Sequence, residues 1–240
     1  MLGRKSAIAG GPKRTSETTR ACDGGAVGAS SGLLVGARVA TAMGWRPVEA
    51  LEVGDLVLTF DAGLQPLTQI SSKPVWSGEF SAPKRFWPLH VPAGALGNRC
   101  ALTLLPNQFV MIESDAGEEL FGDPFSLIKS EALNGLNGID AIPPAHGQAA
   151  MVLHFDTDQV AFDQSGVLYY CPSSEGFLTA ETPFYTALTQ EETNLLMMCI
   201  KSEATLDKLW VPQTQERIKT RIQTRIQTRI RTRSHPGAVA

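Results

Sequence analysis

The side chains that could do chemistry in this sequence are few and widely separated. Four cysteines, Cys22, Cys100, Cys171 and Cys199, form no CxxC pair. This spacing argues against a zinc site or a disulfide framework and favours isolated, mostly buried thiols. Unpaired thiols mildly favour a reducing compartment such as the cytoplasm.

The imidazole and carboxylate groups are just as scattered. No two of the four histidines have the spacing of metal ligands on one helix or strand, and we interpret His154, in an apolar run, as a satisfied core or edge imidazole. Asp156 and Asp158 share a strand face and could bind a hard cation, but two carboxylates lack the further oxygen ligands that such an ion needs. We therefore expect solvated carboxylates, no metal site and no cofactor.

Two serine hydroxyls lie side by side where Ser30 and Ser31 precede Gly32. A serine hydroxyl is a poor nucleophile unless a partnered base accepts its proton. We interpret the pair as the end of a flexible linker rich in Ala, Gly and Ser. A nucleophilic role for Ser31 stays open as the alternative.

The composition indicates a globular chain with many turns. The 240 residues are 43% hydrophobic and 19% charged, with 22 Gly and 15 Pro, which allows a core and short strands. No run approaches about 18 consecutive apolar residues, so no membrane-spanning helix is predicted. The first twenty residues have no apolar segment of a cleaved secretion signal, and secretion without such a signal stays open.

Short apolar runs between turn residues predict an all-β domain of curled antiparallel strands. Eight runs are interpreted as strands: ARVAT, DLVLTF, LQPLTQISSKPVW, FWPLHV, LTLL, FVMIES, MVLHFD and VLYYC. Two stretches, VEAL (48–51) and FSLIKSEAL (125–133), are predicted as short helical turns.

One later stretch breaks the strand pattern. Thr189 and Glu192 fit a capping box, and the apolar residues that follow predict one short helix. We interpret its apolar side chains as a face packed on the sheet. A groove for a partner is the alternative.

Charge is segregated toward the two ends of the chain, although the net charge is only -3. From Arg217 onward there are seven Lys or Arg and no acid, and the first twenty residues have five basic groups and one acid, leaving nine basic against 23 acidic residues between them. An acidic body confines any nucleic-acid contact to the ends. We interpret the repeat RIKTRIQTRIQTRIRTR as a disordered extension; a basic arm for nucleic acid or another anionic surface is the alternative.

The stretch GLLVGARVATAMGWRPVEALEVGDLVLTFDAGLQPL (32–67) resembles the start of bacterial Hint domains, the Hedgehog/intein self-processing fold. In that family a nucleophile precedes "GT.I.T..G", followed by "RPVE.L..GD.VLT.D.G.QP". Three later segments resemble the family in the same order: VPAGALGNRCALTLLPNQFVMI (91–112), ELFGDPFSLIKSEALNG (119–135) and HFDTDQVAFDQSGVLYYCPSSEGF (154–177). The resemblance covers about residues 32–177 and implies an all-β, horseshoe-shaped Hint fold with halves related by a pseudo-twofold axis.

The resemblance also implies a chemistry. In such domains a Cys or Ser attacks the preceding carbonyl, and a "T..H" pair polarises the scissile amide and protonates its nitrogen. Here these three positions fall on Gly32, Leu105 and Gln108, which supply neither a nucleophile, nor a hydroxyl, nor a group that titrates near neutral pH. Thr103, on the same strand face as Leu105, is interpreted as a surface or edge threonine. A later family histidine falls on Asp158.

We therefore predict a Hint domain that has lost, or nearly lost, self-cleavage and serves as a structural or interaction module. Its site positions would be Ser31, Gly32, Thr103 and Gln108, capable at most of an autocatalytic rearrangement of a peptide bond. The first alternative is an active self-cleaving domain in which Ser30 or Ser31 performs an N–O shift. The second is binding of nucleic acid or an anionic surface through the basic tail.

These patterns predict four regions along the chain. They are a disordered N-terminal segment (1–31), a Hint-like domain (32–185), a short helical extension (186–212) and a basic low-complexity tail (213–240). The partner, the substrate and the oligomeric state are not indicated by any of these patterns.

Overall fold

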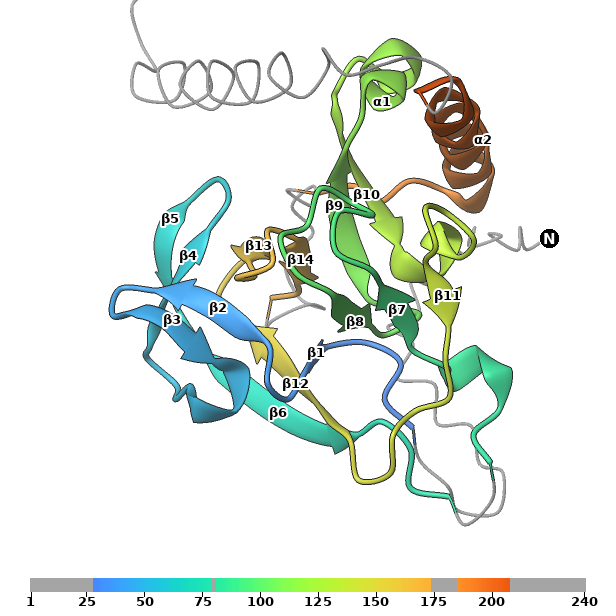
Figure 1. Ribbon diagram of the computed structural model, residues 1–240. Helices are drawn as coiled ribbons and strands as arrows, with labels where there is room; N and C mark the ends of the chain where they lie inside the picture. Colours follow the sequence, from blue (N-terminus) through green and yellow to red (C-terminus); the bar gives the residue numbers. More distant parts are fainter. Residues whose placement is uncertain (1–27, 79–80, 174–184, 208–240) are drawn as a thin grey trace, which may run out of the picture. The chain divides into compact units, whose positions relative to one another are not determined.

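The structure is a computed structural model, and it describes residues 28–78, 81–173 and 185–207 (Figure 1). Contacts divide the chain into two compact units. Among the described residues, the first unit combines those within 28–111 and 127–187, and the second combines 112–126 with 188–207. The predicted disordered N-terminus up to residue 27 and the basic tail lie outside the described residues.

The largest sheet has eight strands in the order β10-β9-β14-β13-β4-β2-β3, with β5 paired to β4. The neighbouring strands from β9 to β3 in this order pair antiparallel, and so do β4 and β5. The strands are β2 (Arg38–Thr41), β3 (Gly44–Pro47), β4 (Leu56–Thr59), β5 (Gly63–Pro66), β9 (Phe109–Glu113), β10 (Phe125–Lys129), β13 (Gln159–Phe162) and β14 (Leu168–Cys171).

Two three-stranded antiparallel sheets belong to the first unit. In one, β12 (Ala149–His154) lies between β1 (Leu33–Leu34) and β6 (Gln69–Pro74), as Figure 1 shows. In the other, β7 (Leu89–Val91) lies between β11 (Asp140–Ala141) and β8 (Leu102–Leu104). The prediction of an all-β domain of antiparallel strands is confirmed.

Burial follows the two-residue period of a strand where one face is covered. In β4, Val57 and Thr59 are buried, whereas Leu56 and Leu58 are exposed. A second pattern occurs in β10, where three consecutive residues, Ser126 to Ile128, are buried. Because successive side chains of a strand point to opposite faces, both faces of β10 are covered there, although this strand is the last in the order of its sheet.

The two predicted helical turns have different outcomes. VEAL forms a 3-10 turn, η1 (Val48–Ala50), which confirms that prediction. The prediction of a helical turn for FSLIKSEAL is wrong in its first half. Phe125–Lys129 forms the strand β10, and only Ser130–Leu133 forms a 3-10 turn, η3. A short apolar run that is buried on both faces cannot be distinguished from a buried helix by periodicity alone. A further 3-10 turn, η2, covers Lys84–Phe86.

The second unit contains two helices that pack against each other, α1 (Asp115–Phe121) and α2 (Gln190–Asp207) (Figure 1). The sequence patterns did not predict α1, although Ser114 caps its first turn by accepting a 3.0 Å hydrogen bond from the Gly117 amide. A helix of seven residues is too short to show a clear apolar period. Among the described residues, no helix is both long and apolar enough to span a membrane.

The predicted capping box at the start of α2 is confirmed. The amide and the hydroxyl of Thr189 both donate to the Glu192 carboxylate at 2.8 Å, and the Glu192 amide donates back to the Thr189 hydroxyl at 3.2 Å. These reciprocal bonds satisfy amide groups that have no partner inside the helix. Leu196 and Met197 are buried, and Met198 is exposed.

Candidate functional site

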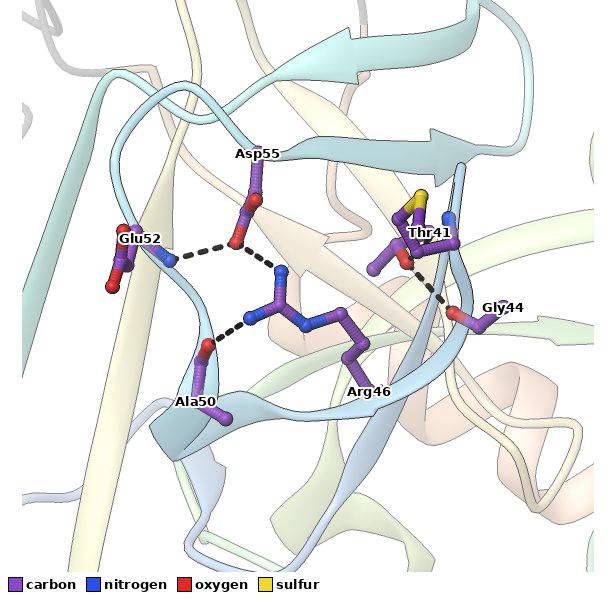
Figure 2. Close-up of polar contacts among 7 residues, drawn as sticks. Thr41, Gly44, Arg46, Ala50, Glu52 and Asp55 are labelled. Carbon is purple, nitrogen blue, oxygen red and sulfur yellow. Dashed lines mark hydrogen bonds and ion pairs between the residues drawn. The ribbon is translucent and has the colours of Figure 1, made fainter.

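A polar network holds the stretch that opens the family resemblance (Figure 2). The Arg46 guanidinium pairs with the Asp55 carboxylate at 2.7 Å and also donates to the carbonyl of Ala50. The same carboxylate oxygen of Asp55 accepts the amide of Glu52 at 2.8 Å. The "RPVE.L..GD" spacing therefore closes a loop around one ion pair, and none of these groups lies at the predicted cleavage position.

Two further contacts stabilise the chain on either side of this loop. The Glu49 carboxylate accepts the Gly36 amide at 3.0 Å, which ties η1 to the turn after β1. The Thr41 hydroxyl donates to the Gly44 carbonyl at 2.7 Å and closes the β2–β3 hairpin (Figure 2). The motif residues thus have structural roles that do not depend on catalysis.

The peptide that joins Ser31 to Gly32 lies against the start of β9. The Gly32 amide donates a 2.8 Å hydrogen bond to Oε1 of Gln108. One residue earlier, the carbonyl of Ser30 accepts the Asn107 amide at 2.7 Å. Ser31 is exposed and Gly32 is buried. The structure therefore brings together two of the predicted positions, Gly32 and Gln108, and adds Asn107, for which no sequence pattern gave a signal.

Gln108 is buried and uses both ends of its carboxamide. Its Nε2 donates to the carbonyls of Phe109 at 2.8 Å and Tyr170 at 2.9 Å, while Oε1 accepts the Gly32 amide. Three separate segments of backbone therefore meet at one side chain. A carboxamide does not exchange protons near neutral pH, so these bonds cannot move a proton onto a peptide nitrogen.

The other two positions of the predicted site lie elsewhere. Leu105 is fully buried in an apolar cluster with Ala29, Leu34, Val75 and Ala150. The half-buried Thr103 lies in β8 opposite His90 of β7. Among the described residues, the hydrogen bonds of the Ser30–Ser31–Gly32 backbone do not include the Thr103 hydroxyl.

The backbone at Gly32 has a conformation that suits glycine. Its φ is +117°, in a range that residues with side chains rarely adopt. A Cβ placed on Gly32 would lie 2.8 Å from the carbonyl oxygen of Met151 and 3.2 Å from Cγ2 of Val152. A nucleophilic side chain at this position would therefore require the backbone of β12 to move.

The remaining acidic and imidazole groups do not form a site. Asp158 is not merely solvated, as expected, because its carboxylate accepts the Ser173 amide at 3.0 Å and so stabilises the chain after β14. Asp156 is exposed. The interpretation of His154 as satisfied is wrong, since its Nδ1 is buried without a hydrogen-bond partner. Within the described ranges, no three His, Cys, Asp or Glu side chains gather in a way that could hold a metal ion.

The thiols differ in exposure more than the sequence predicted. Cys171 is buried, and burial raises the pKa of its thiol to about 12, although a hydrogen bond with the backbone of Ala161 opposes that shift. Cys100 is exposed, which corrects the expectation of mostly buried thiols. Cys22 lies outside the described residues.

One family model and two solved structures match this chain. The model of the Hint domain family matches residues 31–166. The fold is similar to a splice-inactive variant of the AceL NrdHF class 3 split intein, with 16% identity over 60% of this chain and 98% of that chain and a TM-score of 0.36. It is also similar to a bacterial intein-like domain from Clostridium thermocellum, with 12% identity over 59% of this chain and 99% of that chain and a TM-score of 0.39. No curated protein sequence matches the chain. Because the family model covers more than half of the 240 residues, the chain belongs to the Hint domain family.

Proposed function

We propose that this Hint domain has lost, or nearly lost, self-cleavage and serves as a structural or interaction module that stays joined to its N-terminal segment. One observation carries the proposal: the group that meets the Gly32 amide is the carboxamide of Gln108. Cleavage at this peptide would need a proton on the departing nitrogen. Gln108 accepts a hydrogen bond there and has no proton of suitable acidity to give.

The surroundings of this peptide support the same proposal. Both N–H groups of the Gln108 carboxamide already donate to carbonyls, that of Phe109 at the start of β9 and that of Tyr170 in β14. Leu105, at the position of the family hydroxyl, lies in an apolar cluster. Gly32, at the position of the nucleophile, has no side chain. Attack, polarisation and proton transfer therefore each lack the group that would perform them.

The mass of the intact chain tests this proposal. The purified full-length protein is incubated for a day at neutral pH, with and without hydroxylamine, which would capture an ester intermediate. We expect only the uncleaved mass in both samples. A fragment ending at Ala29 or Ser30 that disappears in the Ser30→Ala/Ser31→Ala variant would contradict the proposal, because each serine would attack the carbonyl of the residue before it.

An alternative activity is favoured by one contact at Ser30. The Asn107 amide donates to the Ser30 carbonyl at 2.7 Å, and a fixed amide donor can stabilise the negative charge that develops on a carbonyl under attack. In this alternative, the Ser31 hydroxyl attacks that carbonyl, the C–N bond breaks, and the nitrogen takes up a proton as an ester forms. Hydroxylamine would then release a fragment ending at Ser30, and Ser31→Ala alone would abolish it.

Binding through the basic tail is an independent candidate function, which rests on the charge of residues 217–233 alone. These residues lie outside the described part of the chain. The proposal predicts affinity for single-stranded nucleic acid that falls steeply with salt and is lost when the chain is truncated after Glu216. Absence of binding at low salt would exclude it.

A further inference from the structure

The three positions that the family resemblance assigns to catalysis all lie in or against one short segment of the chain. We call residues 28–35 the strap. Its backbone is bonded along its length: the Ala29 amide donates to the Pro74 carbonyl at 2.9 Å, and the Val35 amide donates to the Ala149 carbonyl at 3.0 Å. Between these ends, Leu33 and Leu34 pair with β12 as strand β1. The strap therefore lies in the first unit like a bound extended peptide.

The apolar side of the strap depends on Leu105. Ala29 and Leu34 are buried in the cluster that Leu105 shares with Val75 and Ala150. A hydroxyl in place of the Leu105 side chain would be placed among methyl and methylene groups, where an unpaired polar group costs free energy. Leucine at this position therefore adds to the contact that holds the strap.

The polar side of the strap depends on Gln108. This side chain faces one amide, that of Gly32, and two carbonyls, those of Phe109 and Tyr170. A carboxamide offers an acceptor and two donors, which matches these three groups. A neutral imidazole offers one acceptor and one donor, so histidine could not bond to all three of these groups. An ionised carboxylate has no donor at all.

The third position, Gly32, lets the strap approach β12 closely. Its φ is +117°, and a Cβ added there would lie only 2.8 Å from the Met151 carbonyl oxygen, so this residue cannot carry a side chain without a shift of the backbone. Close approach of the strap recurs at Gly28, where a Cβ would lie 2.9 Å from the ring of Phe86. Glycine is therefore required at these two positions of the strap, because a side chain would collide with neighbouring residues.

We infer that Leu105 and Gln108 form a clasp that binds the strap, with Gly32 as the strap residue that this contact requires, so that the place of the family's chemistry is now a binding site for the chain's own residues 28–35. This inference rests on the proposed loss of cleavage. Gly32 in the strap and the two residues of the clasp suit this contact, and a cysteine at position 32, a threonine at position 105 or a histidine at position 108 would weaken it. The clasp anchors whatever precedes residue 28 to the first unit.

Amide hydrogen exchange of the full-length chain tests the clasp. We expect Gln108→His to accelerate exchange of the Ala29, Gly32 and Asn107 amides by at least about tenfold, because an imidazole cannot bond to the Gly32 amide and to both carbonyls at once. Gln65→His is the matched control, since Gln65 is more exposed and its carboxamide bonds only within the β4–β5 hairpin. The Phe60 amide, which donates to the Val160 carbonyl between β4 and β13, serves as the reporter of unfolding of the sheet.

A second pair of variants isolates the steric part of the clasp. Gly32→Ala and Gly36→Ala both place a side chain at positive φ, +117° and +95°, but a Cβ at Gly36 meets nothing within 4 Å. We expect Gly32→Ala to expose the strap amides and Gly36→Ala to leave them protected. If Gln108→His unfolds the whole domain, this pair alone decides the question.

Two results would overturn the clasp. One is unchanged protection of the strap amides in Gln108→His. The other is equal behaviour of Gly32→Ala and Gly36→Ala. Exchange is read from the uncleaved chain by mass, so self-cleavage of the wild-type protein would contradict the proposed function separately, without deciding whether the strap is held as described.

Discussion

The guanidinium of Arg46 and a carboxylate oxygen of Asp55 lie 2.7 Å apart and close the loop that contains the Gly54 turn (Figure 2). The family resemblance rests in large part on this stretch. Its motif residues hold the loop through this pair, through the Ala50 carbonyl and through the Glu52 amide. None of these bonds involves the Ser31–Gly32 peptide. A chain can therefore keep the family's architecture while the groups at the cleavage position change.

Removal of the Asp55 carboxylate tests this structural role. Asp55→Ala leaves the Arg46 guanidinium and the Glu52 amide without their shared acceptor. We expect the free energy of unfolding to fall by about 1–2 kcal/mol, as for hydrogen bonds to a charged group, with the lower end favoured because both side chains are partly exposed. Urea denaturation measures the change. Glu52→Ala is the control, because Glu52 contributes its backbone amide and not its side chain; an equal loss in both variants would contradict the prediction.

The extent to which the sequence predicted this molecule differs between its elements. Strands with alternating or continuous apolar residues, such as β4 and β12, were evident from periodicity. The order of the family motifs placed Gly32 and Gln108 correctly beside each other, although they are 76 residues apart. The helix α1 and the strand β10 were missed because a seven-residue helix and a strand buried on both faces have no distinctive period.

The geometry of the strap could not be predicted from the sequence. Residues Gly28 to Ser31 have the composition of a flexible linker, and their backbone hydrogen bonds to Pro74 and Asn107 leave no mark in side-chain patterns. The φ of Gly32 depends on how closely β12 approaches, which is a property of the tertiary fold. The family resemblance indicated which positions to compare, and only the structure shows what Gly32, Leu105 and Gln108 contact.

The thiols provide a prediction about reactivity. We expect a maleimide reagent at pH 7.5 to label Cys100 within minutes and to leave Cys171 unlabelled in the folded protein, because Cys100 is exposed whereas burial raises the pKa of the Cys171 thiol to about 12. The thiolate is the reactive species, and a raised pKa removes it at neutral pH. Peptide mapping by mass spectrometry identifies the labelled residue. Rapid labelling of both thiols in the native protein would contradict the buried environment of Cys171.

The capping box at the start of α2 predicts that Glu192 titrates at a lower pH than an ordinary glutamate. Hydrogen bonds from the backbone amide and then the hydroxyl of Thr189 lower the pKa of Glu192 below its ordinary value. A lowered pKa in the fold means that the contribution of Glu192 is present above the ordinary pKa of about 4.3 and is lost as the pH falls through the lowered value. We expect Thr189→Ala to raise the Glu192 pKa, measured by carboxyl carbon NMR.

A control in the same turn separates the capping box from a general effect of charge. Glu191→Gln removes a neighbouring negative charge without touching the bonds between Thr189 and Glu192. We expect this variant to keep the Glu192 pKa close to that of the wild-type chain. If Thr189→Ala leaves the pKa unchanged as well, the hydroxyl of Thr189 does not contribute to the lowered pKa.

Buried groups in β14 predict a loss of stability at alkaline pH. Burial raises the pKa of Cys171 to about 12 and, with the charge of Asp163, holds the pKa of Tyr169 well above 10. The unfolded chain therefore releases these protons at lower pH than the folded chain. Stability is fully present below the unfolded pKa values and falls as the pH rises toward the folded ones, for Cys171 by up to about 1.4 kcal/mol per pH unit between about pH 9 and 12.

Denaturation under reducing conditions at pH 8 and pH 10.5 measures this slope. We expect the free energy of unfolding to decline between these values in the wild-type protein and to decline less in Cys171→Ala, although that variant is less stable at pH 8 because it loses a buried side chain. Cys100→Ala should keep the wild-type slope, since Cys100 is exposed. Stability of Tyr169→Phe should also decline less than that of the wild-type protein between these pH values, because a phenyl ring has no proton to release. Equal slopes in the wild-type protein and Cys171→Ala would mean that the thiol is ionised in the fold, and Cys171 would then have to be accessible to water.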